Sequence, residues 1–275
     1  MLGSAVLRVM DEKAEWQVYG TVRDPSAKRF FGDKIRANII AGVNIEQVDQ
    51  LVGILQSSRP NVVINCVGLI KQKEAVDDPL VALPVNAIFP HRLAGLCKLF
   101  DARLIHISTD CVFSGSRGNY VESDIVDARD LYGVSKAIGE LNYSHTITLR
   151  TSIIGHELQS SNGLLEWFLS QKNACKGYTR AIFSGLPTVV LAQIVLKHVI
   201  PNHELYGIYH VASQPISKYE LLKIIADVYE KEITIIQDDE LVINRSLNSD
   251  RFKTATKFEC PTWLGLIKEM HKQKR

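Results

Sequence analysis

The 275-residue sequence lacks the features that mark secreted, membrane-spanning and metal-binding proteins. Its five cysteines are widely spaced and include no C-x-x-C pair. We therefore expect reduced thiols in a cytoplasmic protein, with neither a disulfide framework nor a metal site. No apolar run reaches the roughly 18 residues that span a bilayer, and the apolar start has no basic region of the kind that opens a signal peptide. No membrane partner is expected.

An excess of charge of one sign is also missing. The chain has 32 Lys+Arg against 30 Asp+Glu, a net charge of +2, and the only basic cluster is the tail at 268–275. Such a balance gives no basic stripe for a nucleic-acid backbone, so no nucleic-acid partner is expected. A hydrophobic content of 46% with 23% charged residues is that of a folded globular protein.

Short apolar runs alternate with amphipathic stretches through the first two thirds of the chain. Strands are predicted at 17–21, 38–41, 62–67, 103–107, 146–153 and 207–212, and helices between them at 45–56, 79–100 and 132–143. This alternation predicts an α/β fold with a doubly wound, Rossmann-like parallel sheet, whose ligands bind at the carboxyl ends of the strands. We expect residues 1–155 to form that domain. Residues 156–275 should form mainly a smaller lobe, with 186–213 returning to the first domain.

The strongest local signal is the run Tyr132-Gly133-Val134-Ser135-Lys136. Positions i and i+4 share one face of a helix, so the phenol and the ammonium project together. A cation beside a phenol lowers its pKa, and such a tyrosine can exchange a proton with an alcohol or a ketone. The bare pattern is common, however, and by itself it favours an ordinary surface helix that carries Tyr and Lys.

A second group of polar residues strengthens that interpretation. The predicted strand at 103–107 is followed by Ser108-Thr109-Asp110, and the loop 115–130 then leads into the tyrosine helix. A hydroxyl of Ser108 or Thr109 at this strand end can bind the same substrate oxygen as Tyr132. A helix cap is the alternative role for these residues, but no helical pattern follows them.

The run from His106 to Glu140 closely resembles the extended short-chain dehydrogenase/reductases, and within them the dTDP-4-dehydrorhamnose reductase branch. It combines H-I-S-T-D-x-V-F-x-G, an acidic Y-x-E-x-D loop and Y-G-x-S-K. The matches Asn65–Gly68, Val85–Ala87, Leu149–Thr151 and Arg245–Ser249 follow in order along nearly the whole chain. The resemblance implies a smaller C-terminal lobe that binds substrate, and an NAD(P)H-dependent reduction of a 4-keto-6-deoxy sugar on a nucleotide, in surface-polysaccharide precursor synthesis.

By that resemblance Thr109, Tyr132 and Lys136 are the catalytic residues. Tyr132 is the general acid, Thr109 orients the keto oxygen, and Lys136 binds the nicotinamide ribose while lowering the tyrosine pKa. The residues expected at the cofactor are Gly3, Arg23, Asn44, Cys66, Val67, Gly68, Asn86, Ser108, Tyr132 and Lys136. Those expected at the substrate are Asp110, Val112, Phe113, Arg245, Asn248 and Ser249.

Arg23 bears on the choice of cofactor. It follows the second predicted strand, where an acidic residue would bind the ribose 2′-hydroxyl of NAD, and an arginine suits the 2′-phosphate of NADP. NADP(H) is therefore favoured over NAD(H), although a surface arginine in a turn has the same appearance. The expected partners are a nucleotide-sugar substrate and, as an option, a second copy in a homodimer.

Two other functions remain open. One is a nucleotide-sugar epimerase or dehydratase of the same superfamily. Dehydratases usually carry an acidic residue directly after the threonine together with a following lysine, whereas here Cys111 follows Asp110. The other is a non-catalytic nucleotide-binding regulatory subunit, like that of methionine adenosyltransferase.

The resemblance also draws attention to the first residues. The superfamily begins with a strand and a G-x-x-G-x-x-G turn, and residues 1–7 match only its last glycine, Gly3, and the helix after it. We expect the sheet to lack its first strand and dinucleotide to bind weakly. A late start codon or a truncated fragment explains this better than a real loss, because the Tyr132/Lys136 pair has little use without a nicotinamide.

Overall fold

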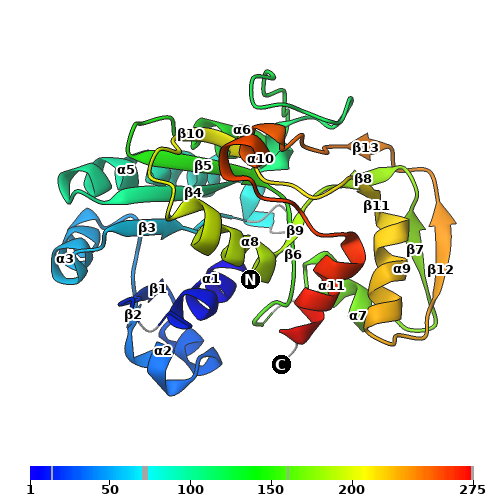
Figure 1. Cartoon of the computed structure of the whole chain (residues 1–275), viewed down its shortest axis with the longest axis horizontal. Coiled ribbons are helices and arrows are strands. Elements are labelled where there is room, and N and C mark those ends of the chain that lie inside the picture. The colour runs from blue at the N-terminus through cyan, green and yellow to red at the C-terminus, as the bar shows by residue number, and fades with distance from the viewer. Residues whose placement is uncertain (14, 70–73, 160, 274–275) are drawn as a thin grey trace.

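The computed structural model describes residues 1–13, 15–69, 74–159 and 161–273, and a parallel sheet lies at the centre of its larger lobe (Figure 1). The strand order is β10–β5–β4–β3. These strands are β3 (Val62–Asn65), β4 (Arg103–Thr109), β5 (Thr146–Thr151) and β10 (Gly207–His210). All six residues of β5 are buried, as expected for a strand that is covered on both faces.

Helices cover both faces of this sheet. Ile105 packs with buried residues of α1 (Leu2–Asp11) and α8 (Thr188–Ile194). Its neighbour Leu104 packs on the opposite face with α3 (Val48–Ser58) and α5 (Phe89–Leu99), because adjacent strand residues point in opposite directions. The doubly wound α/β fold is therefore confirmed.

A second parallel sheet contains only β1 (Gly20–Val22) and β2 (Ile39–Ala41). A 3₁₀ helix (Pro25–Phe30) and α2 (Asp33–Ala37) connect its strands. Within the described residues no strand joins this pair to β3, so the two parallel sheets are separate.

The smaller lobe is built from short strands and helices at the other end of the molecule (Figure 1). β7 (Ala174–Tyr178) pairs with β12 (Thr234–Asp238), and β8 (Ala181–Phe183) lies between β11 (Ile216–Ser217) and β13 (Ile243–Asn244). β6 (Ile153–Ile154) pairs with β9 (Leu186–Pro187). The helices after β6, apart from α8, are α7 (Leu164–Ser170), α9 (Lys218–Val228), α10 (Asp250–Thr256) and α11 (Trp263–Lys272).

The two lobes share one hydrophobic core. Phe168 of α7 and Ile267 of α11 belong to the same buried cluster as Ile105 of the main sheet. Residues 188–210 contribute α8, a π-helical turn (Val195–Val199) and β10 to the larger lobe. The last helix, α11, ends at Lys272, and residues 274–275 lie outside the described residues.

One helical stretch is longer than the apolar runs in the sequence indicate. A 3₁₀ turn (Glu74–Asp77) precedes α4 (Pro79–Ala82), which continues through a π-helical turn (Leu83–Ile88) into α5. The resulting 21 residues, Pro79–Leu99, are long and apolar enough to cross a membrane by length and composition only. Half of its apolar window is buried inside the fold, which is the pattern of a core helix.

Candidate active site

Helix α6 (Leu131–Ile138) begins directly against the turn that follows β4. Asp130 caps it, because its carboxylate accepts a 2.7 Å hydrogen bond from the Gly133 amide. A Cβ atom added at Gly133 would lie 2.3 Å from the Cys111 carbonyl oxygen, so only glycine allows this approach. The contact brings the Tyr132 hydroxyl beside the Thr109 side chain, whose hydrogen bond lowers the pKa of the phenol.

Thr109 has a second role in this turn. Its Oγ1 accepts a 3.1 Å hydrogen bond from the Cys111 amide and donates a 3.2 Å one to an Asp110 carboxylate oxygen. It therefore caps a 3₁₀ turn, Asp110–Val112, where the sequence pattern indicated no helix.

The Lys136 ammonium is buried one helical turn after Tyr132. Its side chain is almost fully enclosed, and Nζ donates a 2.8 Å hydrogen bond to the Ile107 carbonyl of β4. Burial lowers the pKa of Lys136 to about 8, while the nearby Glu140 carboxylate and the Cys66 thiol oppose that shift. The group is therefore mostly protonated at neutral pH.

The pKa of Tyr132 moves in the direction opposite to the prediction. Burial raises it above its usual value, the Cys111 thiol and the carboxylates of Asp110 and Asp130 raise it further, and only the hydrogen bond with Thr109 lowers it. The expected lowering by Lys136 is corrected: the ammonium is bound to Ile107 instead, and desolvation dominates at the phenol.

The loop after β3 lies against the same lysine. A Cβ atom added at Gly68 would lie 3.8 Å from Lys136 Nζ and 3.4 Å from Asn86 Oδ1. Asn86 is buried, accepts a 2.9 Å hydrogen bond from the Leu69 amide and donates a 3.2 Å one to Ser135. Asn86 thus connects the loop at Cys66, Val67 and Gly68 to helix α6.

Gly3 lies in the first turn of α1, beside the same loop. A Cβ atom placed there would lie 3.5 Å from Cys66 Cβ, so the helix N-terminus faces the end of β3. Helix N-termini attract anions because their amides are unpaired and their dipole is positive. This is the position in which the sequence places a pyrophosphate.

The remaining predicted cofactor residues, Arg23 and Asn44, lie at the separate two-stranded sheet. Arg23 is exposed directly after β1. Asn44 follows β2, where its amide donates to Gln50 and its side-chain oxygen accepts from Glu46. Both stand at carboxyl ends of parallel strands, but the described contacts of Asn44 are those of a turn.

Asp110 lies among cations from the smaller lobe. Burial raises the pKa of this carboxyl, and Arg245, hydrogen bonds from Cys111 and Thr109, and Lys218 oppose the rise. Arg245 donates a 2.7 Å hydrogen bond from Nε to the Phe113 carbonyl. Lys218, the first residue of α9, was missed from the sequence, where it looks like an ordinary helix start.

Val112 and Phe113 are corrected by the structure. Both side chains are fully buried and pack with Tyr120 and Leu247, so they lie beneath the predicted substrate site rather than within it. Phe113 stacks on Tyr120 with ring centroids 4.2 Å apart. The sequence alone does not show whether two apolar side chains after a strand end point into the core or toward a substrate.

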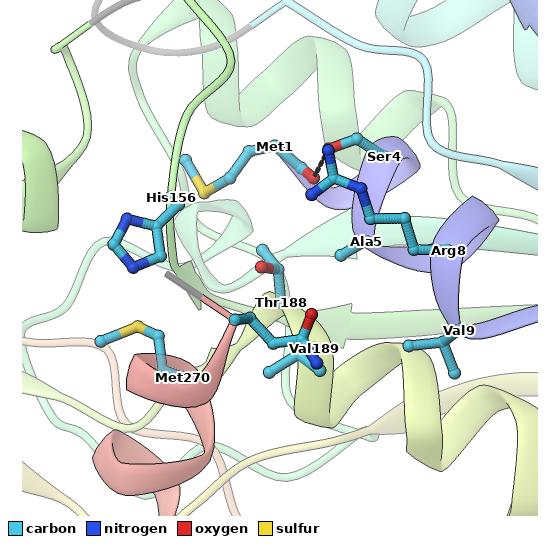
Figure 2. A pocket seen from close by; sticks show the side chains of 10 residues that line it. Met1, Ser4, Ala5, Arg8, Val9, His156, Thr188, Val189 and Met270 are labelled. Carbon is cyan, nitrogen blue, oxygen red and sulfur yellow. Dashed lines mark hydrogen bonds between the residues drawn. The ribbon is translucent and has the colours of Figure 1, made fainter. Parts of the chain in front are cut away.

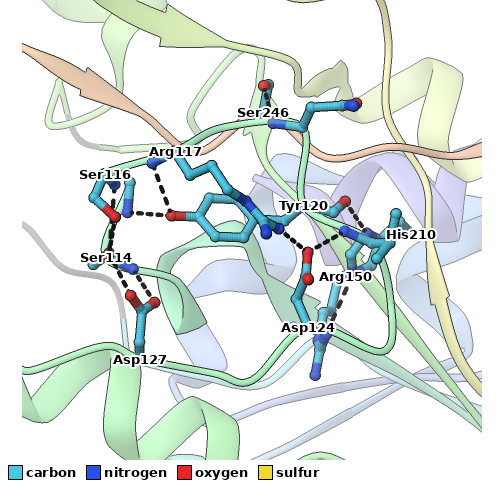
Figure 3. A network of polar contacts seen from close by, with 12 residues as sticks. Ser114, Ser116, Arg117, Tyr120, Asp124, Asp127, Arg150, His210 and Ser246 are labelled. Carbon is cyan, nitrogen blue, oxygen red and sulfur yellow. Dashed lines mark hydrogen bonds and ion pairs between the residues drawn. The ribbon is translucent and has the colours of Figure 1, made fainter.

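The Tyr120 ring connects the loop before α6 to the chain near the C-terminus (Figure 3). Its hydroxyl accepts hydrogen bonds from the Gly115 and Arg117 amides. Its amide donates a 2.9 Å bond to Ser246, and its carbonyl accepts a 2.8 Å bond from the Asn248 amide. The loop and residues 246–248 are thus joined by backbone pairing.

The other two predicted substrate residues lie on this joined segment. The Asn248 side chain bonds to Asp250 at 3.0 Å, and Ser249 Oγ donates to the Ala212 carbonyl at 3.4 Å. Both are only half-buried, so their side chains are accessible from solvent.

A buried ion pair runs beneath the site. Glu140 accepts two 2.7 Å hydrogen bonds from Arg150 of β5 and a third, also 2.7 Å, from the Ser108 hydroxyl. The side chains of Arg150 and Glu140 are only 4% and 6% exposed. Sequence inspection missed Glu140, although a lone arginine in the buried run TITLRT signals that a carboxylate must lie nearby.

The two strand histidines, which the sequence indicates are core residues with satisfied ring nitrogens, differ. His210 is satisfied: Nδ1 bonds to the Tyr120 carbonyl and Nε2 to Arg150. Burial, with the Arg150 charge adding to it, lowers the pKa of His210 to about 4. His106 is fully buried with Nδ1 on Asn65, but its Nε2 has no partner within the described residues.

The two pockets described for the structure lie away from these residues. One, of about 30 Å³, is lined by Met1, Arg8, His156 and Met270 among others (Figure 2). The other, about 280 Å³, lies between α8 and α11. Neither is lined by a predicted site residue. The described residues also include no group of three His, Cys, Asp or Glu side chains that could hold a metal.

A family model, the RmlD substrate binding domain, matches residues 1–275. The chain belongs to this family. The dTDP-4-dehydrorhamnose reductase of Aggregatibacter actinomycetemcomitans is 31% identical over 196 residues, which is 67% of this chain and 67% of that protein. The matched segment in the Streptomyces griseus enzyme of the same name is 41% identical but covers only 30% of this chain and 27% of that protein.

A crystal structure from Bacillus anthracis shows the same fold as this RmlD-family chain. That protein, a dTDP-4-dehydrorhamnose reductase in complex with NADP, superposes with a TM-score of 0.75 at 20% identity, over 92% of this chain and 98% of that one. Methionine adenosyltransferase 2 subunit beta of Xenopus laevis is 25% identical over 83% of this chain and 69% of its own length.

Proposed function

We propose that this protein is a reductase of a nucleotide-activated 4-keto-6-deoxy sugar, dependent on NAD(P)H and acting in surface-polysaccharide precursor synthesis in the cytoplasm. The observation that carries the proposal is the hydrogen bond between Tyr132 and Thr109, one helical turn from the buried Lys136. The family match supports the same reaction.

These residues suit the transfer of a proton to a developing alkoxide. The raised pKa of Tyr132 keeps the phenol protonated, which is the form a general acid needs in a reduction. Thr109 holds the phenol at the end of β4 and helps to orient the keto oxygen. A reduced nicotinamide, when bound, supplies the hydride to the carbonyl carbon. Tyr132 delivers the proton to the oxygen, and an alcohol results.

The residues around Lys136 fit the nicotinamide half of the cofactor. A Cβ atom at Gly68 would be in van der Waals contact with Lys136 Nζ and Asn86. Cys66 and Val67 follow the end of β3, and Ser108 lies at the end of β4. The N-terminus of α1 at Gly3 suits the pyrophosphate. We propose that Arg23 and Asn44 hold the adenosine end, and that Arg23 favours the 2′-phosphate of NADP(H) over NAD(H).

The substrate side is formed by the smaller lobe and the loop before α6. Arg245 and Lys218 surround the single carboxylate of Asp110 with two cations, which suits an anionic nucleotide sugar. Asn248 supplies an amide group and Ser249 a hydroxyl group on the same side of the proposed site. The dTDP-sugar reductases among the relatives make a dTDP-sugar the first substrate to test.

The test mixes purified protein with NADPH and a dTDP-4-keto-6-deoxyhexose and follows the absorbance of the reduced nicotinamide. We expect oxidation that needs both the sugar and the protein. Binding of NADPH without oxidation by any nucleotide keto-sugar would overturn the proposal. The oligomeric state, for which we propose a homodimer, is measured on the same sample by light scattering.

A regulatory subunit is the second candidate, because the methionine adenosyltransferase subunit aligns with 83% of this chain. In that case the protein would bind the dinucleotide and leave it unreacted. The two candidates separate in one experiment: turnover with a keto-sugar favours the reductase, and saturable NADPH binding without turnover favours the subunit.

A further inference from the structure

Glu140 lies next to the proposed catalytic residues without belonging to them. It follows α6 and stands four residues after Lys136, which itself stands four residues after Tyr132. Lys136 Nζ binds the carbonyl of Ile107, and Glu140 accepts from the hydroxyl of the next residue, Ser108, so the two charged groups lie beside adjacent residues of β4. Its charge is the strongest of the neighbouring groups that favour the protonated form of Lys136.

Three hydrogen bonds hold the carboxylate in place. Arg150 binds it with two parallel donors, a geometry that resists rotation, and the Ser108 hydroxyl binds the oxygen that Arg150 Nε also reaches. Ser108 adjoins Thr109, and the Arg150 guanidinium lies 5.2 Å from the Phe113 ring centroid. Glu140 is therefore fixed to both strands that end at the site.

The other groups around Lys136 do not replace this charge. Asn86 and Ser135 are neutral, and the burial of Cys66 raises the pKa of its thiol to about 12. His106 on β4 is buried, and burial together with the Lys136 charge holds its pKa well below the usual value, so its ring is neutral. Tyr132 is protonated. Glu140 is the negative charge among these groups.

We propose that Glu140 is a positioning residue of the site: held by Arg150 and Ser108, its carboxylate keeps the buried Lys136 ammonium charged. The consequence for catalysis rests on the proposed reductase function: the charged Lys136 has three N–H donors, so two remain for a ribose beside the one that binds Ile107. The effect on Lys136 itself does not depend on that function, and it is measurable without cofactor or substrate.

The experiment titrates Lys136 directly. The whole chain is labelled with ¹³C,¹⁵N-lysine, and the Nζ chemical shift of Lys136, assigned from its loss in Lys136→Met, is followed with pH by NMR. We expect the wild-type midpoint near 8. In Glu140→Gln, which keeps the shape and a hydrogen-bond acceptor but removes the charge, the midpoint should fall below that of the wild type.

Arg150→Gln is the matched control, because it breaks the same ion pair from the other side. Burial, Glu140 and Cys66 are the groups that shift the pKa of Lys136, and Arg150 is not among them. Its loss should leave the Lys136 midpoint unchanged or raise it. Equal falls in Glu140→Gln and Arg150→Gln would mean that the pair acts only through structure, and the proposal would be overturned.

A double variant covers the risk that a single unpaired buried charge unfolds the chain. Glu140→Gln with Arg150→Gln removes both charges together, and circular dichroism checks that it is folded. Because Glu140 acts on Lys136 more strongly than Arg150, the midpoint must still fall below the wild-type value. An unchanged midpoint in a folded double variant contradicts the proposal.

Discussion

Parallel strands end in two very different surroundings in this molecule. At the ends of β4 and β5, charged and polar side chains are buried and bound to partners: Arg150 to Glu140, Ser108 to the same carboxylate, Lys136 to Ile107. At the ends of β1 and β2, Arg23 is exposed, and Asn44 bonds to the nearby residues Glu46 and Gln50. In the first region, the organised region, the polar side chains are held in place before any ligand binds. In the second, the open region, fewer contacts hold the side chains.

This difference has a consequence for how each region tolerates change. When one member of a buried polar network is removed, its partners lose their hydrogen bonds. Because they are buried, they cannot form replacement hydrogen bonds with water. An exposed arginine is hydrated in the free protein, and its contribution appears only when a ligand binds. Substitutions in the two regions should therefore differ in size and in what they alter.

The largest effect is expected at the centre of the organised region. Tyr132→Phe removes the proposed acid and should lower kcat by about 10²- to 10⁴-fold while the Kd for NADPH changes little. Steady-state kinetics and a binding titration measure the two effects. Activity that survives the change would assign the acid to another group.

Breaking the buried ion pair should have the largest effect on stability. Arg150→Met leaves Glu140 charged and enclosed, so the free energy of unfolding should fall by about 3–5 kcal/mol, as measured by urea denaturation. Arg23→Ala is the control from the open region and should change it by about 0.5 kcal/mol or less. If the free energy of unfolding falls by similar amounts in the two variants, the two regions do not differ in how they tolerate substitution.

The close approach of α6 to the helix beside it gives a steric test. A Cβ atom at Gly139 would lie 1.9 Å from the Asn86 carbonyl oxygen, so Gly139→Ala should force the backbone apart and cost about 1–3 kcal/mol. Gly53 lies in the exposed part of α3 with nothing within 4 Å of an added Cβ. Gly53→Ala should therefore stabilise the protein by up to about 1 kcal/mol, since alanine is the better helix former.

The buried lysine predicts a pH dependence of stability. Its pKa is about 8 in the folded protein against 10.5 as the ordinary value, so the unfolded chain binds more protons between these limits. Stability from this group therefore rises with pH through that window. The free energy of unfolding of the wild type relative to that of Lys136→Met, measured by urea denaturation, should be larger at about pH 9.5 than at about pH 7. A smaller difference at the higher pH would contradict a buried ammonium.

The smallest effect is expected at Arg23. Arg23→Ala should raise the Kd for NADPH more than that for NADH, because only NADPH carries the 2′-phosphate. Calorimetric titration with both cofactors measures the ratio. If both affinities weaken equally, Arg23 does not contact the 2′-phosphate, and the open region does not discriminate between NADPH and NADH.

The prediction from sequence succeeded where periodicity is strong and short in range. The apolar runs at β3, β4 and β5 and the i, i+4 pair on α6 were recognised because each depends on a few neighbouring residues. The end of α6 was predicted five residues too late, at Tyr143 instead of Ile138. Gly139 follows the helix directly, and it packs against Asn86, 53 residues away in the sequence.

The same reason explains the errors at the site. Val112 and Phe113 were assigned to the substrate, but Tyr120 and Leu247 cover them. The direction of the Tyr132 pKa shift was wrong because the sequence shows that Lys136 is near but not that its ammonium binds Ile107, nor how far the phenol is buried.

The sequence by itself determined the fold class, the family and the order of Thr109, Tyr132 and Lys136 along the chain, because these follow from residue types at short spacing. Tertiary structure alone decided which charges meet. Arg150 finds Glu140 ten residues away, on the other side of a turn, and Tyr120 pairs with residues near the C-terminus. Electrostatic energies depend on distance and burial in space, and neither quantity can be read along the chain.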